Sequence, residues 1–436
     1  MIKRSILPRL TYSAIFYLLM PIIVLRLIYR AIKAPAYAAR WSERFGFVGA
    51  VKSSEDIIWL HAVSVGETLA AVPLVKALQA TYPDHRLLVT CMTPTGSERI
   101  RVVFGDSVDH CYAPYDTPGA VARFLDRLTP KMLLIMETEL WPNTVAACYQ
   151  RQIPVVLANA RLSEKSARGY GRVRQLSTPM FSQLTAVAAQ HRDDGTRFEA
   201  LGLPSERLYI SGNIKFDLDL SVQVKLNAQQ LIQQWHSQEQ RPVLLAASTH
   251  RGEDELILQA FSQIKQHIDN VLLVLVPRHP ERFGQVAGLC VDAGFTVVRR
   301  SSNDTVDEAD ILLGDSMGEL MTFYGACDIA FVGGSLVANG GHNMIEPAAW
   351  GKPVLSGSSV FNFTEVSRLL TEAGGLILVE TPAALAETVI QLIKNPQRAQ
   401  QMGQQAQQVA EANRGALEKL LTVIDRSLGA QHPGGS

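Results

Sequence analysis

The chain has no excess of either charge, since 41 Lys and Arg residues balance 41 Asp and Glu residues over 436 positions. A formal net charge of zero argues against a general nucleic-acid-binding protein, which needs a basic surface to meet phosphates. The five cysteines show no CxxC or CxH spacing, which favours free thiols in a reducing compartment over a disulfide framework. No GxxxxGKS or GxxxxGKT loop is present, which argues against P-loop phosphoryl transfer.

The amino terminus differs from the rest of the chain because it carries no charge between Leu10 and Leu25. These 16 residues would form a helix of roughly 24 Å, whereas the hydrocarbon core of a bilayer is roughly 30 Å thick. A tilted span and a helix embedded in one leaflet both fit this length. The alternative is a buried core helix.

No small-residue cleavage pattern follows this apolar run, so we predict an uncleaved membrane anchor over residues 1–33. The charges that come next are all basic until Glu43 is reached. Cations just after an anchor keep the following domain on the cytoplasmic side and attract anionic lipids. The basic residues in this flank are Arg26, Arg30, Lys33, Arg40 and Arg44.

Short apolar runs alternate with amphipathic stretches along the rest of the chain, which predicts buried parallel strands separated by helices. The pattern occurs twice, on either side of a polar, Gln-rich stretch from Gln223 to Gln240. We therefore predict an α/β protein with two Rossmann-like domains facing across a cleft, over residues 34–222 and 223–428. Residues 429–436 are predicted to form a disordered tail. The predicted strands are IIWLHAV, LLVTCMT, MLLIMET, PVVLANA and TAVAAQ in the first array, and PVLLAAS, VLLVLVP, FTVVRR, DIAFVGG, KPVLSG and GLILVE in the second.

The stretch from Phe331 to Pro353 combines a buried-strand signal, a glycine-rich turn and an acid-bearing helix. Gly334 and the neighbouring glycines let the backbone approach a ligand closely, and Asn343 is a candidate cap for the helix. Free N–H groups at a helix start attract a phosphate, and Glu346, one turn further, could accept hydrogen bonds from ribose hydroxyls. The pattern favours a nucleotide site, the alternative being a tight turn before an ordinary helix.

Acidic side chains follow two predicted strands of the first domain. Glu67, in SVGET, opens a helix, where it could take a proton from an attacking hydroxyl or merely complement the helix dipole. Glu139 lies beside Trp141 in TELWPN, which suits sugar binding or the tuning of a neighbouring base. The alternative for Glu139 is an acid at a helix start.

Cationic side chains follow other predicted strands. Arg161 and Lys165 lie in the loop NARLSEKSARGY, which could meet an anionic acceptor or form a solvated face. Lys215 lies near the domain boundary. Arg278 directly follows the strand VLLVLV, where arginine suits bidentate contact with a phosphate.

Metal ligands are not indicated by the sequence. His279 and His342 have no partner spacing typical of a metal site, and we interpret them as structural or hydrogen-bonding residues. The lone DxD that starts at Asp217 begins a polar segment instead of ending a strand. Stabilisation of a single phosphate by cations and a helix start, without a metal, is the interpretation that we favour.

Six motifs occur in a fixed order behind the basic-flanked anchor: HAVSVGE, METELWPN, NARLSEKSARGY, STHRGEDE, VPRHPERF and GGSLVANGGHNMIEPA. In this combination the chain resembles the lipid A 3-deoxy-D-manno-octulosonic acid (Kdo) transferases, and the resemblance extends from RWSERFG to the final helices. It implies a GT-B glycosyltransferase that moves Kdo from CMP-Kdo to the lipid A precursor lipid IVA, with inversion and with no metal or other cofactor. The implied setting is lipopolysaccharide core biosynthesis at the cytoplasmic face of the cell inner membrane.

The resemblance also implies roles for individual residues. Glu67 is similar to the family's general base, and Glu139 is similar to a second essential acid. Together with the residue patterns above, the resemblance predicts a donor site made of Lys215, Arg278, His279, Gly334, Ser335, Asn343 and Glu346. The predicted acceptor-binding residues are Ser64, Asn143, Arg161 and Lys165.

Two rival functions fit the same patterns. One is another GT-B transferase that uses a UDP-sugar and a lipid acceptor. The other is a non-catalytic, membrane-bound sensor of sugar nucleotides, against which the presence of both Glu67 and Glu139 counts. The sequence leaves open the number of Kdo units transferred, the oligomeric state, the binding of acyl chains and whether the anchor spans the bilayer.

Overall fold

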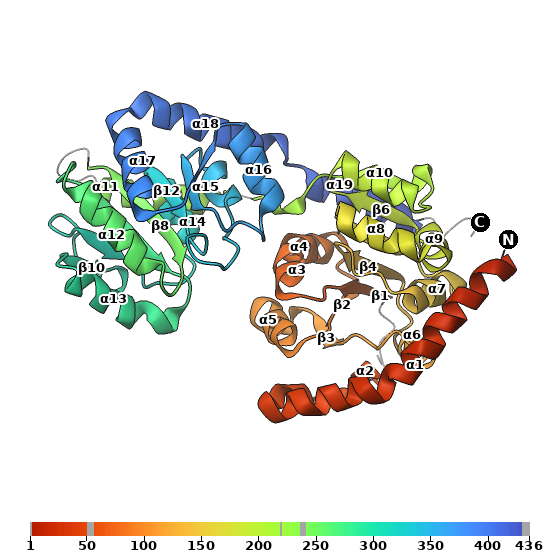
Figure 1. Ribbon diagram of the computed structural model, residues 1–436. Coiled ribbons are helices and arrows are strands. Elements are labelled where there is room, and N and C mark those ends of the chain that lie inside the picture. Colours follow the sequence, from red (N-terminus) through yellow and green to blue (C-terminus); the bar gives the residue numbers. More distant parts are fainter. Residues whose placement is uncertain (1, 50–55, 219, 236–240, 430–436) are drawn as a thin grey trace. The chain divides into compact units, whose positions relative to one another are not determined.

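The computed structural model describes residues 2–49, 56–218, 220–235 and 241–429, and the predicted tail lies outside them from residue 430 onward. The chain forms two compact units, coloured along the sequence in Figure 1. The first contains residues 1–217 and 414–436, and the second contains residues 218–413. The first boundary therefore lies between residues 217 and 218, not between 222 and 223 as predicted.

The first unit is built on a sheet of seven parallel strands in the order β3-β2-β1-β4-β5-β6-β7. Five of them match the predicted apolar runs. Two short strands were not predicted: β3 is partly polar, with Asp109 and His110, and the edge strand β7 has an apolar run of only three residues. The strands are β1 (Asp56–His61), β2 (His85–Cys91), β3 (Asp109–Tyr112), β4 (Met132–Met136), β5 (Val155–Ala160), β6 (Ala186–Ala189) and β7 (Leu208–Ile210).

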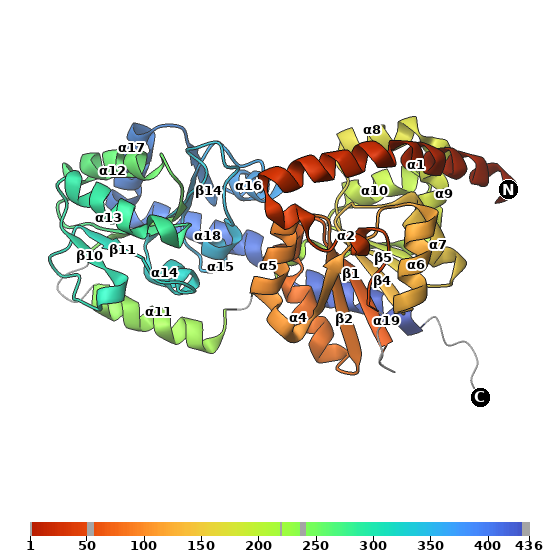
Figure 2. The same ribbon diagram turned by 90° about the horizontal axis from the view of Figure 1, so that it is seen from below.

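Helices cover both faces of this sheet (Figure 2). Apolar side chains of α4, α5 and α19 pack on one face, and those of α6, α7, α9 and α10 pack on the other. The helices of the first unit are α1 (Ile2–Lys33), α2 (Trp41–Arg44), α3 (Val65–Ala70), α4 (Val72–Thr81), α5 (Pro94–Phe104), α6 (Pro118–Leu128), α7 (Pro142–Gln150), α8 (Glu164–Arg172), α9 (Arg174–Ser182), α10 (Arg192–Ala200) and α19 (Ala416–Gly429).

The predicted end of the second domain at residue 428 is wrong, because α19 returns to the first unit. Leu420 and Ile424 of this helix are fully buried among side chains of the first sheet. At its start, the Asp217 carboxylate accepts hydrogen bonds from the backbone N–H groups of Gly415 and Leu417. An amphipathic helix pattern reports that one face is buried, but not which sheet buries it.

The second unit repeats the architecture with seven parallel strands in the order β10-β11-β9-β8-β12-β13-β14. Only β11 was not predicted, since three residues give too short a run. The strands are β8 (Val243–Thr249), β9 (Leu272–Pro277), β10 (Val297–Arg299), β11 (Ile311–Leu313), β12 (Ile329–Val332), β13 (Val354–Gly357) and β14 (Leu376–Val379).

Helices α12, α13 and α17 pack on one face of the second sheet, and α11 and α14 pack on the other. The helices are α11 (Val222–Trp235), α12 (Asp254–Lys265), α13 (Phe283–Asp292), α14 (Leu320–Ala326), α15 (Ile345–Ala349), α16 (Thr364–Glu372), α17 (Pro382–Lys394) and α18 (Pro396–Ala412). The prediction of an α/β chain with two Rossmann-like domains is confirmed.

The predicted anchor is one continuous helix, α1, that runs from Ile2 to Lys33 along the first unit (Figure 1). Its residues Leu7–Lys33 are long and apolar enough to cross a membrane. The alternative of a buried core helix is wrong, because large apolar side chains such as Leu18, Ile22 and Leu25 are exposed.

Candidate active site

The strand orders place a topological switch point in each sheet, where ligands of Rossmann-like folds bind at the carboxyl ends of the strands. In the first sheet it lies between β1 and β4, and in the second it lies between β8 and β12. The segments that follow β1, β4 and β12 carry most of the predicted site residues, and Arg278 and His279 follow β9, the neighbour of β8. The pattern of residues directly after strands therefore located the candidate site in both domains.

Glu67 is buried one turn into α3, directly after β1. Its two carboxylate oxygens accept hydrogen bonds from the backbone N–H of Val63, at 2.8 Å, and from the Ser64 hydroxyl, at 2.8 Å. Ser64 in turn caps α3 by accepting the N–H of Glu67. Burial raises the pKa of Glu67 to about 7, against the lowering effect of the two hydrogen bonds.

A carboxylate with this pKa can accept a proton near neutral pH, as a general base must. The structure thus gives Glu67 a capping contact and a shifted pKa at the same time. Ser64, predicted to bind the acceptor, lies against Glu67 and donates a hydrogen bond to one of its carboxylate oxygens.

The second acidic cluster lies after β4. Glu137 adopts a left-handed backbone conformation, with φ of 56°, and its carboxylate pairs with the Lys215 Nζ at 3.5 Å. Glu139 is partly buried, and burial raises its pKa. The negative charges of Glu137 and Glu139 both act to raise the pKa of Glu67, so the three acids form one electrostatic cluster.

Lys215 was predicted to belong to the donor site, but it lies in the first unit, where it pairs with Glu137. The sequence placed it near the domain boundary without showing on which side it folds. Its charge balances one acid of the cluster around Glu67. We correct the prediction accordingly, since the contact with Glu137 assigns Lys215 to the first switch point.

Asn143 was predicted to bind the acceptor, and this prediction is wrong. Its side chain is buried and donates to the Ser13 Oγ at 3.0 Å and to the Asp116 carbonyl at 2.7 Å. The Asp116 carboxylate also accepts the backbone N–H of Asn143 and of Thr144 at the start of α7. Asn143 therefore ties α1 to the domain and presents no free polar atom to a substrate.

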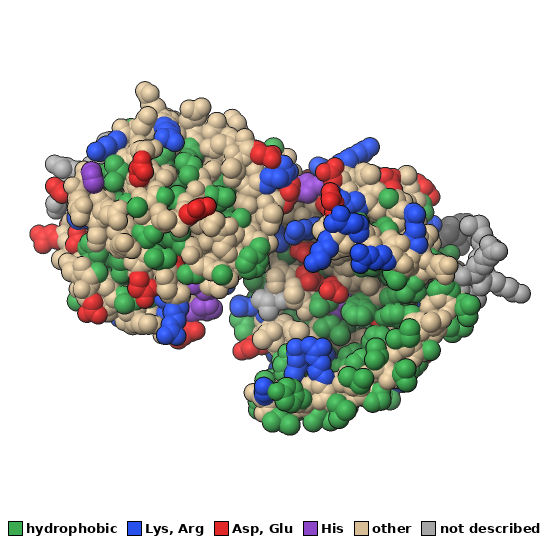
Figure 3. Space-filling model, in the orientation of Figure 1, with side chains coloured by type: hydrophobic (Ala, Val, Ile, Leu, Met, Phe, Trp, Pro, Cys, Tyr) green, Lys and Arg blue, Asp and Glu red, His purple; other side chains and the backbone are tan. Residues whose placement is uncertain are grey.

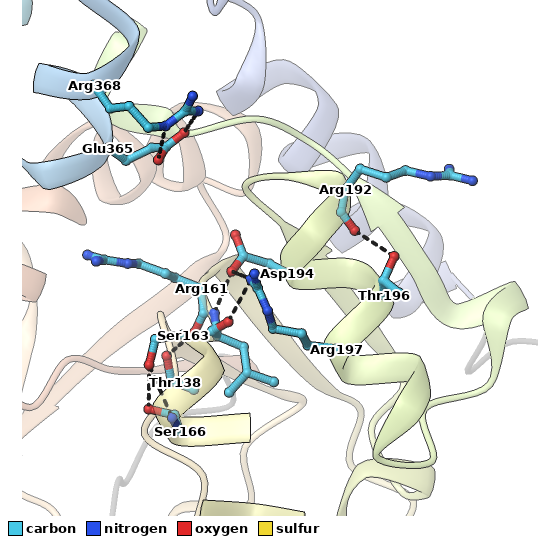
Figure 4. A network of polar contacts seen from close by, with 11 residues as sticks. Thr138, Arg161, Ser163, Ser166, Arg192, Asp194, Thr196, Arg197, Glu365 and Arg368 are labelled. Atoms are coloured by element: carbon cyan, nitrogen blue, oxygen red, sulfur yellow. Dashed lines mark hydrogen bonds and ion pairs between the residues drawn. The ribbon is translucent and has the colours of Figure 1, made fainter. Parts of the chain in front are cut away.

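The basic loop after β5 is fixed through hydrogen bonds of its backbone (Figure 4). Thr138 donates to the Arg161 carbonyl, and the Asp194 carboxylate accepts the N–H of Leu162 at 2.8 Å. The side chain of Arg161 extends away from this network in Figure 4, and Lys165 is exposed on α8. Two cations on a fixed loop suit an anionic ligand.

The glycine-rich turn after β12 is organised by a residue that sequence reasoning missed. Glu253 is fully buried, and its carboxylate accepts the backbone N–H groups of Gly334 at 2.6 Å, of Ser335 at 2.9 Å and of Leu336 at 2.9 Å. It also accepts the N–H of His250. These three amides are therefore occupied by a carboxylate, whereas the sequence had suggested that the backbone of this turn approaches a ligand closely.

Gly334 and Ser335 consequently shape the turn. Gly334 has φ of 68°, which favours glycine, and an added Cβ there would lie 3.0 Å from the His342 ring. The Ser335 hydroxyl donates to the Val332 carbonyl and accepts the N–H of Gly357. Both residues therefore shape the turn after β12, and their polar groups are taken up by these contacts instead of facing a ligand.

Four of the other predicted donor residues do gather at the second switch point. Arg278 follows β9 as predicted. Burial raises the pKa of Glu346 to about 7, although the hydrogen bond from Asn343 and the charge of Arg278 both lower it. The Asn343 side chain accepts the N–H of Ile345 at 3.1 Å and donates to Glu346 at 3.2 Å. The predicted capping position is wrong by one residue, because the N-cap of α15 is Met344 and Asn343 precedes it. His279 is half exposed.

A pair of histidines lies beside these residues. The Nε2 atoms of His250 and His342 are 2.8 Å apart, with the two rings nearly coplanar, so one ring donates and the other accepts. Burial, together with the neighbouring cations, lowers the pKa of both imidazoles, to about 4 for His342. The pair links the end of β8 to the glycine-rich turn.

Within the described residues, no group of three or more His, Cys, Asp or Glu side chains could hold a metal ion. Asp217 of the DxD pair caps α19, and Asp219 lies outside the described residues. The prediction that no metal takes part stays a prediction, since the reaction itself decides it.

Residues 39–218 match the family described as 3-deoxy-D-manno-octulosonic-acid transferase (kdotransferase), and residues 229–409 match glycosyl transferases group 1. The 3-deoxy-D-manno-octulosonic acid transferase of Haemophilus influenzae is 44% identical over 95% of this chain and 98% of its own length. This chain belongs to the Kdo transferase family. The Bordetella pertussis transferase is 36% identical over 88% of this chain and 91% of its own length.

Among solved structures, UDP-GlcNAc 2-epimerase from Neisseria meningitidis covers 85% of this chain and all of its own, with a TM-score of 0.55. At 15% identity this similarity shows the fold alone. It agrees with the GT-B type of architecture, in which two Rossmann-like domains follow one another along the chain. Both predictions, of the family and of the fold class, are confirmed for this Kdo transferase homologue.

Proposed function

We propose that this chain transfers Kdo from CMP-Kdo to the lipid A precursor lipid IVA, with inversion at the anomeric carbon and without a metal. The observation that carries the proposal is Glu67, a buried carboxylate with a pKa raised to about 7 at the first switch point. Membership of the Kdo transferase family supports the choice of sugar and donor.

In the proposed reaction, ionised Glu67 takes the proton of an acceptor hydroxyl. The hydroxyl oxygen attacks the anomeric carbon of Kdo, and the bond from that carbon to the CMP phosphate oxygen breaks. The electron pair leaves with CMP, whose phosphate carries the developing charge. Arg278 is the cation placed to balance that charge, because the amides of the glycine-rich turn are occupied by Glu253.

The remaining groups have supporting roles in this proposal. Glu346, held by Asn343, accepts hydrogen bonds from the ribose hydroxyls of the donor. Arg161 and Lys165 meet the phosphates of the acceptor, since both are exposed on a loop whose backbone is fixed. Helix α1 holds the enzyme at the cytoplasmic face of the inner membrane, where lipid acceptors lie.

The test is transfer from CMP-Kdo to tetra-acylated lipid A precursor in detergent with EDTA, followed by mass spectrometry. Wild-type protein should add the mass of Kdo, and Glu67→Gln should lose about 10²- to 10⁴-fold in rate, the range supplied by general base catalysis. Glu411→Gln, at an exposed glutamate of α18, is the matched control and should keep full activity.

Three outcomes would reject the proposal or part of it. Transfer from UDP-sugars but not from CMP-Kdo would establish the rival GT-B activity. CMP binding without turnover in folded wild type would establish the sensor. Loss of activity in EDTA that is restored by a divalent cation would reject the metal-free mechanism.

A further inference from the structure

Helix α1 has two different faces from Leu7 to Lys33, the part whose side chains the structure describes. The less exposed face recurs every three or four residues and is formed by Arg9, Tyr12, Ser13, Phe16, Met20, Ile23, Val24, Leu27 and Ala31. The opposite face is exposed and almost entirely apolar, with Leu7, Thr11, Ala14, Leu18, Ile22, Leu25, Tyr29 and Ile32. Hydrophobic side chains consequently cover the outer surface of α1 in Figure 3. Contacts with α7 and α9 place the helix alongside the domain.

Polar contacts fix the first half of α1 to the domain. Ser13 is buried and exchanges hydrogen bonds with the Asn143 side chain, at 3.0 and 3.1 Å. The Tyr12 hydroxyl bonds to the buried Asp116 carboxylate. The Tyr17 hydroxyl accepts the N–H of Gly119 at 3.3 Å. All three contacts lie within the uncharged stretch that the sequence marks as the anchor.

The segment after α1 is fixed as well. The Glu43 carboxylate accepts the N–H of Tyr112 at 2.8 Å, and Arg44 donates to the Met92 carbonyl at 3.0 Å. The Arg44 carbonyl accepts the N–H of Tyr115. The RWSERFG segment therefore connects the carboxyl end of α1 to the edge of the first sheet. The first domain thus holds α1 both through Ser13 and Tyr17 and through the segment that follows it.

These contacts disfavour a helix that crosses the bilayer. If α1 crossed while docked, the buried Asp116 and the neighbouring Arg123 would enter the hydrocarbon, where a charged side chain is strongly disfavoured. If α1 undocked, the Asn143 amide would lose its Ser13 partner, and Ser13 would keep only the Arg9 carbonyl within α1. A helix that lies in the membrane plane incurs neither cost.

The charges of the amino terminus suit the same orientation. No acidic residue occurs before Glu43, whereas Arg26, Arg30 and Lys33 are exposed towards the end of α1. Cations beside an apolar stripe are typical of interfacial helices that bind anionic lipids.

We infer that α1 does not span the membrane but lies in its plane, with the apolar stripe from Leu7 to Ile32 embedded in a bilayer that contains anionic lipids and the opposite face docked on the first domain. This inference deepens the membrane location within the proposed function and is independent of the transfer chemistry. It orients the first domain with the docked face of α1 towards the cytoplasm, so the acceptor would reach the domain from the membrane surface.

Depth measurements along α1 test this orientation. Single cysteines replace Leu7, Leu18 and Ile32, which are 71%, 78% and 77% exposed, in the full chain, whose own five cysteines are all buried. Each is labelled with NBD and bound to phosphatidylethanolamine–phosphatidylglycerol vesicles carrying nitroxide lipids of known depth. We expect all three labels at one shallow depth, about 5–10 Å into the headgroup and acyl boundary. Val102→Cys, 71% exposed on α5, is the aqueous reference and should not be quenched.

A deep label at Leu18 with shallow labels at Leu7 and Ile32 would overturn the inference in favour of a spanning helix. A cleavable amino-terminal tag gives a second readout in sealed vesicles that expose Val102→Cys on the outside. An in-plane helix leaves the tag open to added protease, whereas a spanning helix protects it until detergent is added. Absence of quenching at all three positions would reject the bilayer as partner, and none of these outcomes depends on transfer activity.

Discussion

The two switch points each contain a buried glutamate one short loop after the first strand of the sheet, yet the two carboxylates are held differently. Glu67, after β1, accepts one backbone N–H and one hydroxyl. Glu253, after β8, accepts four backbone N–H groups, two on each oxygen. The two glutamates therefore differ in the number of fixed hydrogen-bond donors: Glu67 has two and can still exchange a proton, whereas Glu253 has four and stabilises the turn.

The difference has a simple electrostatic basis. A carboxylate with four fixed donors is satisfied as an anion and has no lone pair left for a substrate. Glu67 has two donors, two neighbouring acids and a raised pKa, so its protonated and ionised forms are close in free energy at neutral pH. The same residue type at equivalent places in two similar domains thus has a raised pKa in one and holds a backbone turn in the other.

The largest effect that would test this comparison is expected for Glu253→Gln. The amide NH₂ would face backbone donors, and hydrogen bonds to a charged group are each worth about 1.5–3 kcal/mol. We expect the free energy of unfolding of the second domain to fall by roughly 3 kcal/mol or more in urea denaturation. Glu255→Gln, at an exposed position in the same helix, is the control and should stay within about 0.5 kcal/mol of wild type. A stable Glu253→Gln variant would break the comparison.

A second test concerns how the second domain neutralises a phosphate when the amides of its glycine-rich turn are occupied by Glu253. In the proposed mechanism Arg278 balances the phosphate charge, so Arg278→Ala should raise the KM for CMP-Kdo by about 10- to 100-fold, the equivalent of a charge-assisted hydrogen bond. Arg278→Lys keeps the charge but loses the bidentate geometry, so it should recover only part of the loss. An unchanged KM in the alanine variant would show that the phosphate lies elsewhere.

The pH dependence of transfer tests whether Glu67 exchanges a proton near neutral pH. With a pKa of about 7, Glu67 is mostly protonated at pH 6, so kcat/KM should fall about tenfold from its plateau there. Steady-state rates between pH 5 and 9 measure this limb. A profile that stays flat from pH 5 to 8 would contradict a base with this pKa.

The same shift affects stability with a definite sign. The pKa of Glu67 is higher in the folded chain than the ordinary value of 4.5, so the folded state binds the proton more tightly. Its contribution to stability is therefore full below pH 4.5 and is lost as the pH rises through 7. Glu67→Gln should remove this part of the pH dependence in denaturation measured at pH 5 and pH 8.

Much of the fold followed from the sequence because buried parallel strands are continuous apolar runs, as β4 and β9 show. The short strands β3, β7 and β11 give no such run. The packing of α19 on the first sheet also escaped prediction, because an apolar stripe shows which face of a helix is buried but not which sheet covers it.

The candidate site followed from the sequence where position after a strand was enough, as for Glu67 and Arg278. It did not follow where a partner distant in sequence decides the role of a residue. Asn143 bonds to Ser13, 130 residues away, and Gly334 bonds to Glu253, 81 residues away. One sequence pattern could have drawn attention to Glu253. A Gly-Glu pair follows the first strand of each domain, in SVGET and again in HRGEDE.

The smallest predicted effect concerns the contact that revised the role of Asn143. Ser13→Ala removes a buried hydroxyl and leaves the Asn143 amide without one partner, so it should lower the free energy of unfolding of the first domain by about 1 kcal/mol. Thr11→Ala is a matched control two residues away, because the exposed Thr11 hydroxyl bonds only within α1, to the Leu7 carbonyl. Hydrogen exchange of α1 in detergent should then accelerate in Ser13→Ala and not in Thr11→Ala. Equal exchange in the two variants would mean that the contact between Ser13 and Asn143 contributes nothing measurable and that α1 is held by its apolar contacts and by Tyr12 and Tyr17.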